Sequence, residues 1–120
     1  MIRPYTQPVA EITLRISRGS DLLPVVVNVS DPDTGELRDD IASAEAAVRT
    51  ADGDKVLDLV VEVNSPNPGQ LKISLPGATS ASTETSNYYH WDVIATFDDG
   101  VISEPLAGGI CIVTKSVTKN

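Results

Sequence analysis

The chain has 120 residues, of which 41% are hydrophobic and only 4% aromatic, and its formal net charge is −8. A domain of this length buries roughly two-thirds of its unfolded surface, here in a mainly aliphatic core. The acidic balance, without a Lys/Arg cluster, excludes nucleic acid as an expected partner and disfavours an anionic membrane surface.

The first residues carry two prolines and little hydrophobic pattern, which predicts an extended arm at residues 1–8 and a domain at residues 9–118. They lack the apolar run of a signal peptide, and no stretch reaches membrane-spanning length. The single Cys111 excludes an internal disulfide and a cysteine-rich zinc site. We therefore expect folding in a reducing cytoplasm, with Cys111 buried and inert.

Alternation of apolar and polar residues begins at residue 11, with Ile12, Leu14 and Ile16 predicted to face inward. A second strand is expected at residues 23–29, with Pro24 near its start, where a missing N–H does least harm. Residues 31–35 are rich in the turn-forming residues Asp, Pro and Gly, which predicts that this second strand ends before them.

Residues 41–50 fit two structures. Asp40 could cap a short alanine-rich helix, whereas a strand would turn Ala44, Ala46 and Val48 toward the core. We predict a strand, because the surrounding rhythm is that of strands and packing often overrides propensity; a helix is the alternative.

The rest of the chain continues the strand rhythm. Its features are a hairpin turn at 51–54, inward Leu57, Leu59, Val61 and Val63, a turn at 64–69, inward Leu71, Ile73 and Leu75, a loop with one helical turn at 76–87, and strands at 89–97 and 110–115. About seven or eight short strands without a strong amphipathic helix predict an all-β, antiparallel β-sandwich.

The strand at residues 89–97 has the strongest pattern, because its aromatic residues share one parity with Val93 and Ala95. Trp91 and Phe97 are expected to anchor the core. Tyr88 and His90 lie on the opposite parity, and with Tyr5 they are the candidates for a partner contact.

No set of residues predicts catalysis. His90 is the only histidine, so a histidine-based metal cluster is impossible and any catalytic triad would need this residue. Paired carboxylates could be drawn from Asp92, Asp98, Asp99 or Glu104, but no aromatic groove accompanies them. We predict no catalytic residue, no cofactor and no enzyme activity.

The densest carboxylate cluster contains Asp31, Asp33 and Glu36. Hard cations prefer such oxygen ligands, yet the spacing differs from an EF-hand, which needs glycine at loop position six and glutamate at twelve. We interpret the cluster as a solvated hairpin turn, with a calcium site as the alternative.

The order of several motifs carries a resemblance over most of the chain. These are residues 18–21, 31–35, 40–44, 48–49, 69–75, 89–93, 99–100 and 106–110. The chain resembles the small immunoglobulin-like β-sandwich modules of tailed bacteriophage virion proteins and is similar to the N-terminal domain of upper-baseplate proteins. The Gly108-Gly109 doublet departs from the expected pattern.

The resemblance implies an immunoglobulin-like sandwich and a virion structural protein of the tail, baseplate or fibre-attachment region. Its partners would be other virion proteins and copies of itself in a symmetric assembly, after folding in the host cytoplasm, with residues 1–8 lying across a neighbouring subunit. The alternatives are a capsid decoration protein and a carbohydrate- or receptor-binding module. The binding module predicts solvent-exposed rings among Tyr5, Tyr88 and Tyr89.

Overall fold

The computed structural model describes residues 10–31, 33–103 and 105–115, and over this part of the chain it contains eight β-strands and one short helix. In chain order these are β1 (Ala10–Glu11), β2 (Leu14–Ser17), β3 (Leu22–Asn28), β4 (Ile41–Arg49), β5 (Lys55–Val63), β6 (Gln70–Leu75), α1 (Gly77–Ser80), β7 (Ser86–Phe97) and β8 (Ala107–Thr114). The prediction of an all-β protein is confirmed. The predicted arm at residues 1–8 lies outside the described residues.

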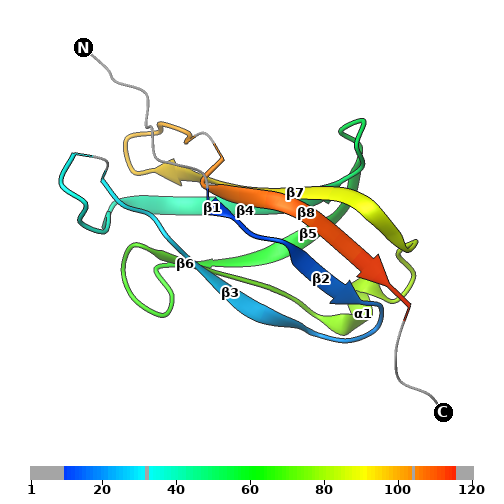
Figure 1. The fold of residues 1–120 in the computed structure, drawn as a ribbon. Helices are drawn as coiled ribbons and strands as arrows, with labels where there is room; N and C mark the ends of the chain where they lie inside the picture. The colour runs from blue at the N-terminus through cyan, green and yellow to red at the C-terminus, as the bar shows by residue number, and fades with distance from the viewer. Residues whose placement is uncertain (1–9, 32, 104, 116–120) are drawn as a thin grey trace.

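The strands form one mixed sheet in the order β1-β8-β7-β4-β5-β6-β3, and β2 follows β1 along the same edge of β8. β1 and β2 run parallel to β8, whereas all other neighbours in this order are antiparallel. In Figure 1 the sheet folds over itself, with β4, β7 and β8 in the upper layer and β3 and β6 in the lower one. Among the described strands, the two edges of the sheet are β1 with β2, and β3.

The predicted antiparallel immunoglobulin-like β-sandwich is wrong, because the two layers belong to one hydrogen-bonded sheet that is nearly closed into a barrel. β5 connects them. Its first half pairs with β4 through Leu57 and Leu59, and its second half pairs with β6 through Val61 and Val63. Side-chain alternation shows which face of a strand is buried but not which strand lies beside it, so it could not reveal this continuity.

β4 settles the ambiguity between helix and strand, and the predicted strand is confirmed. Ala46 and Val48 are buried and Ala44 is half-buried, as the strand prediction required. β4 pairs with β7 on one side and β5 on the other. Two pairing partners and a buried face outweigh the local helix propensity of alanine.

The core lies between the layers and is mainly aliphatic, as composition predicts. β7 contributes its aromatic residues: Tyr89, Trp91 and Phe97 all point inward and are buried, which confirms the parity of this strand. The largest fully buried side chains are Phe97, Leu14, Ile16, Leu71, Ile73, Leu75 and Leu106.

The strand predicted from residue 11 is interrupted between β1 and β2. At this break the indole Nε1 of Trp91 donates a hydrogen bond of 2.8 Å to the carbonyl oxygen of Ile12. Gly109 has φ +147°, and a Cβ at that position would lie 2.7 Å from the same oxygen. The glycine doublet thus has a physical reason: Gly109 leaves space for the carbonyl that Trp91 binds.

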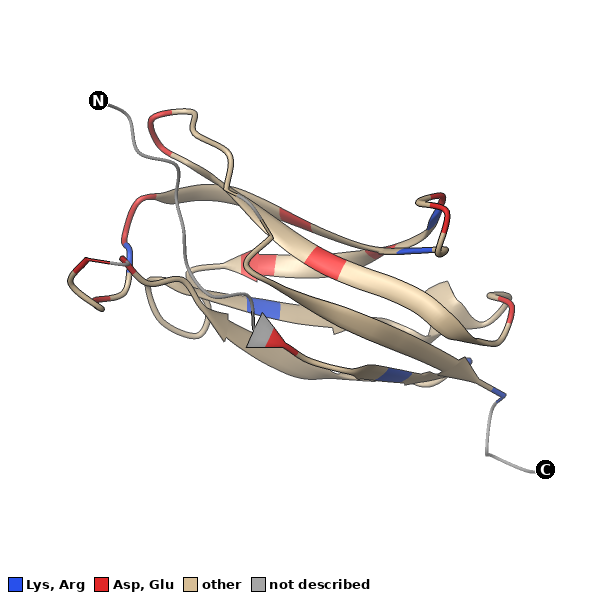
Figure 2. Ribbon diagram, turned by 45° about the horizontal axis from the view of Figure 1, so that its top comes forward, with Lys and Arg blue, Asp and Glu red and all other residues tan. Residues whose placement is uncertain are grey.

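Figure 2 shows that many carboxylates occupy the loops at the two ends of the barrel. The β3–β4 and β7–β8 loops meet at one of these ends, where the Asp98 N–H donates to the Asp40 carbonyl oxygen at 2.8 Å. We call this the acidic end. It contains Asp31, Asp33, Glu36, Asp39, Asp40, Asp98 and Asp99.

Candidate functional site

The outer face of β7 carries two of the three predicted partner-contact residues. Tyr88 is 77% exposed, and His90 is exposed on the same side of the strand. Tyr5, the third candidate, lies outside the described residues. The outward position of Tyr88 and His90 follows from the burial of Tyr89 and Trp91, since successive side chains of a strand point to opposite faces.

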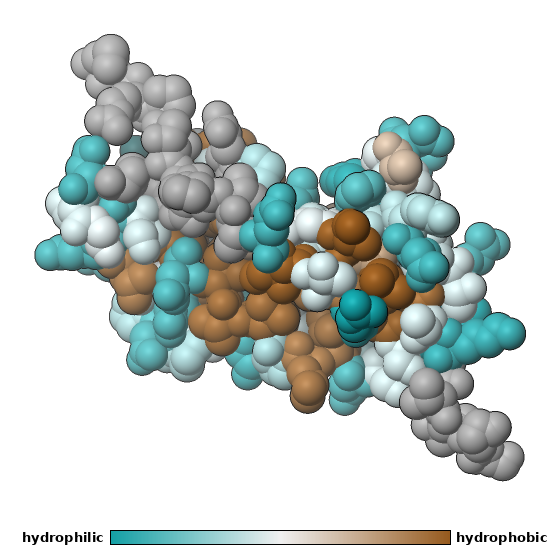
Figure 3. Space-filling view, viewed as in Figure 1, coloured by the Kyte–Doolittle hydropathy of each residue, from teal (hydrophilic) through white to brown (hydrophobic). Residues whose placement is uncertain are grey.

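β8 adds two isoleucines to this face. Ile110 pairs with His90 and is 46% exposed, and Ile112, which is half-buried, pairs with Arg15 of β2. We call these five residues (Arg15, Tyr88, His90, Ile110 and Ile112) the β7–β8 face. It contains the rings of Tyr88 and His90 and two aliphatic side chains, and the next outward residue of β7 after His90 is Asp92. Figure 3 shows that apolar side chains gather where β2, β3 and β8 lie.

The two isoleucines were missed from the sequence, although a signal for them was present. Residues 110–113 read as a continuous apolar run, from which Cys111 was expected to be buried. Cys111 and Val113 are buried, so Ile110 and Ile112 must point outward by alternation. A count of parity along this run would have found them.

The β7–β8 face lies on two strands that each have a neighbouring strand on both sides. β7 is hydrogen-bonded to β4 and β8 on its two sides, and β8 in turn to β1 and β2. A shallow, open hollow borders Tyr88; it is lined by Thr85, Ser86, Asn87, Tyr88, Val113, Thr114 and Lys115. The β7–β8 face is therefore an exposed sheet surface with an open hollow beside Tyr88, and not an enclosed pocket.

Of the carboxylates considered for sugar hydrolysis, Asp92 is not brought together with the adjacent Asp98 and Asp99. Asp92 lies within β7, whereas Asp98 and Asp99 lie in the turn that follows the strand. Asp98 follows Asp92 by six positions of extended chain, which is roughly 20 Å at the rise of a strand. Paired glycosidase carboxylates lie about 5–10 Å apart. Glu104 is outside the described residues.

The cluster of Asp31, Asp33 and Glu36 forms a turn. The Asp31 Oδ1 accepts the N–H of Asp33 at 2.7 Å and that of Thr34 at 3.3 Å. The backbone closes the loop, because the Asp31 N–H donates to the Glu36 carbonyl oxygen at 2.8 Å. This is the hydrogen bonding expected of turn chemistry. Among the described residues, no group of three or more His, Cys, Asp or Glu is placed to hold a metal ion.

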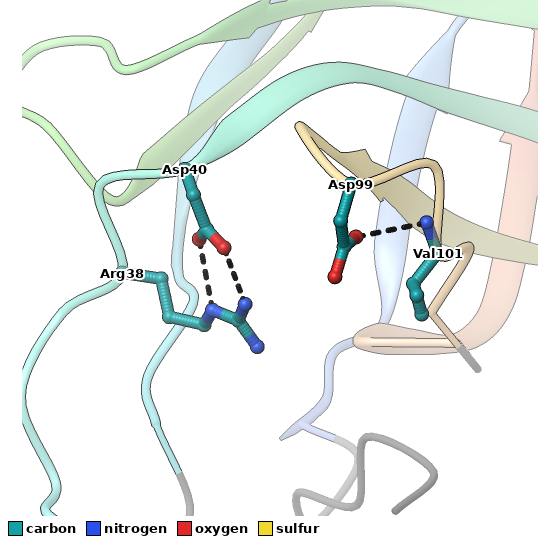
Figure 4. Close-up of polar contacts among 4 residues, drawn as sticks. All are labelled: Arg38, Asp40, Asp99 and Val101. Carbon is teal, nitrogen blue, oxygen red and sulfur yellow. Dashed lines mark hydrogen bonds and ion pairs between the residues drawn. The ribbon is translucent and has the colours of Figure 1, made fainter. Parts of the chain in front are cut away.

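Arg38 is the basic residue of the acidic end. Its Nε donates to the Asp40 Oδ1 at 2.9 Å and its Nη2 to Oδ2 at 2.5 Å, and its guanidinium lies 3.9 Å from the centre of the Phe97 ring. Hydrogen bonding from Arg38 holds the pKa of Asp40 below its ordinary value, although partial burial acts in the opposite direction. Figure 4 shows this pair facing Asp99, whose Oδ1 accepts the Val101 N–H at 3.0 Å.

The side chain of Cys111, a residue of β8, lies in the core, and burial raises the pKa of its thiol to about 11. The thiolate is the nucleophilic and metal-binding form, so the buried thiol is unreactive near neutral pH. The predicted burial of Cys111 is confirmed, and its inertness stays a prediction.

Comparison with models of known protein families found no match, and comparison with curated proteins found none either. Within the described residues we find no helix with the length and hydrophobicity that crossing a bilayer requires.

Proposed function

We propose that this chain is a non-enzymatic structural protein that acts by protein–protein contact, as a bacteriophage virion component of the tail, baseplate or fibre-attachment region. The observation that carries the contact role is the β7–β8 face, where the exposed Tyr88 ring and Ile110 stand on strands held from both sides. Aromatic and aliphatic residues with few charges are typical of the centre of a protein interface.

The charge of the chain also favours a protein as the partner. The net charge of −8 opposes binding to nucleic acid, whereas the β7–β8 face contains Arg15 and His90, with Asp92 next along the outward side of β7. A tyrosine flanked by such groups can bind apolar and acidic parts of a partner protein.

The virion assignment comes from the order of the sequence motifs. The sandwich that the same resemblance implied is overturned, so this part of the proposal depends on the motifs and on the contact surface. Copies of the chain would join other virion proteins after folding in the host cytoplasm.

Particle composition tests the assignment. Virions purified from the producing host are separated into heads and tails, and each fraction is analysed by quantitative mass spectrometry. We expect the chain in the tail fraction, in a constant ratio to the other tail proteins. Its absence from both fractions would contradict the virion proposal, and its presence only on heads would replace the tail location with capsid decoration.

A surface variant tests the contact role. Ile110→Asp places a charge at the centre of the β7–β8 face, and we expect its incorporation into particles to fall by on the order of tenfold or more. Ile102→Asp is the matched control, because Ile102 is 62% exposed and belongs to the β7–β8 loop outside this face. Equal incorporation of both variants, with unchanged melting temperatures, would rule out the β7–β8 face as the contact.

Tyr88 also favours a second candidate, a carbohydrate- or receptor-binding module. Tyr89 is buried, but the Tyr88 ring is exposed beside His90 and could stack on an apolar sugar face. A glycan array with wild type and Tyr88→Ala tests this candidate. Binding that is lost in the variant would support it, whereas no binding by wild type would remove it.

A further inference from the structure

β3 is an open edge of the sheet. It pairs with β6 on one side, and among the described strands none pairs with its other side. β2 precedes β3 in the chain but pairs with β8 instead. A short turn at residues 18–21 joins the two strands, so they approach each other mainly next to this turn. The rest of the β3 edge faces no described strand.

The backbone of β3 directs hydrogen-bonding groups to this open side. The Val29 N–H donates to the Gly69 carbonyl oxygen at 2.8 Å, which places Val29, and by alternation Val27 and Val25, in the ladder with β6. Val26 and Asn28 therefore turn their N–H and C=O groups outward. Unpaired groups of this kind are a template for another strand.

The side chains of β3 do not protect the edge. Residues 22–29 carry no charge, although edge strands are commonly blunted by charged residues. Pro24 and the shift of register between Leu22 and Val25 protect only the start of the strand. Leu23 is 83% exposed and Val26 is 45% exposed. An extended segment could thus gain both backbone hydrogen bonds and apolar contact here.

The segment at residues 1–9, outside the described residues, has a complementary sequence. Pro4 and Pro8 share one parity, so an extended segment would lack N–H groups on that side and keep those of Arg3, Tyr5 and Gln7 on the other. Such a segment can add to an edge on one side only. It would then close the sheet against further addition.

Charge selects the direction of addition. Residues 1–9 contain Arg3 and no acidic residue, and the chain that follows β3 enters the acidic end at Asp31. Antiparallel addition brings Arg3 toward this end, whereas parallel addition would place it at the opposite end of β3. The antiparallel arrangement is therefore favoured.

The antiparallel arrangement cannot form within one copy. β1 and β3 run in opposite directions, as the pairings across the sheet require. Antiparallel addition to its own β3 would bring Val9 near the Leu22 end, yet Ala10 begins β1 at the acidic end. β3 has seven residues, about 23 Å, and one peptide bond spans about 3.8 Å.

We infer that residues 1–9 of one copy add as an antiparallel strand to the β3 edge of a second copy. The inference rests on the proposed assembly function, since it names a contact by which copies join. Nine extended residues reach about 30 Å, enough to cover the whole of β3.

Two proline variants of the full chain test it. Gln7→Pro removes an N–H from the pairing side, whereas Thr6→Pro, the matched control, adds a proline to the side that already has two. Sedimentation velocity at protein concentrations of roughly 1 to 200 µM covers weak to moderate assembly. In this range we expect wild type and Thr6→Pro to self-associate equally. We expect Gln7→Pro to associate on the order of tenfold more weakly.

Amide hydrogen exchange gives a second readout, with Val26 and Asn28 expected to gain protection as wild type associates. A wild type that stays monomeric overturns the inference, as does an equal response of the two variants. If both variants associate like wild type, copies join by another surface, so the inference fails while assembly stands. The proposed function is judged separately by particle composition and Ile110→Asp.

Discussion

The indole Nε1 of Trp91 lies 2.8 Å from the carbonyl oxygen of Ile12, and this hydrogen bond joins the centre of the sheet to its N-terminal edge. Trp91 belongs to β7, whereas Ile12 occupies the break between β1 and β2, two strands away across β8. The only tryptophan therefore has two roles, since its ring fills the core and its N–H satisfies a carbonyl that no strand pairing serves at the break.

Trp91→Phe should destabilise the fold by about 2–4 kcal/mol, because it leaves that carbonyl without its donor and reduces the volume of the core. Urea unfolding measures the loss, and hydrogen exchange should show the amides of β2 exchanging faster. Tyr89→Phe is the control, since it removes only the hydroxyl bond to the Glu84 carbonyl oxygen. Equal effects of both variants on β2 would refute the role of the Trp91 N–H.

Gly109→Ala should cost about 2–4 kcal/mol, because a Cβ would lie 2.7 Å from the Ile12 oxygen at φ +147°. Gly53→Ala is the matched control: Gly53 has φ +98°, but its Cβ would meet no atom within 4 Å. We expect about 1 kcal/mol for Gly53→Ala, from strain alone. The difference in unfolding free energy measures the close approach at Gly109, and a difference near zero would contradict it.

Asp40→Asn should lower stability at pH 7 by at most about 1 kcal/mol, because the ion pair with Arg38 is partly exposed. The pKa of Asp40 is lowered by folding, so the stabilisation is present above the unfolded value of 3.8 and is lost as pH falls through the folded value. Urea unfolding from pH 7 to pH 2 (roughly the range in which carboxylates titrate) should show the gap between wild type and variant closing below 3.8. Asp39→Asn, which removes one carboxylate at an exposed neighbour, is the charge-matched control.

Cys111 should resist alkylation by iodoacetamide in the folded protein at pH 8, because burial holds the pKa of its thiol near 11. Labelling should follow the fraction unfolded as urea is added, and mass spectrometry measures it. Because folding raises this pKa above its unfolded value of 9.0, the free energy of unfolding should also decrease as pH rises above 9.0. Rapid labelling in the absence of urea would show that the thiol is accessible.

The candidate surface was partly predictable from residues alone. The parity of β7 placed Tyr88 and His90 outside and Trp91 inside, because alternation in a strand follows directly from backbone geometry. Ile110 was predictable by the same reasoning applied to β8, although its position beside His90 was not. That position depends on strand register, which is set by partners distant in the chain.

The uncharged edge of β3 was likewise predictable only in part from the sequence. Its apolar, proline-bearing sequence is visible without a structure, but the same residues could form a central strand paired on both sides. Only the order of the described strands places β3 last, so that the backbone groups of Val26 and Asn28 face no described strand on one side. The open edge, and the strand addition inferred from it, thus come from topology.

Local chemistry in the sequence determined the β character of the chain, the inward set of β7, the turn at Asp31 and the aliphatic core, because each depends on near neighbours along the backbone. The tertiary structure alone decided that β5 joins both layers into one sheet, that Ile110 lies beside His90, and that Trp91 binds Ile12. These relationships are contacts between residues far apart in the chain, and their energy depends on packing that no local pattern encodes.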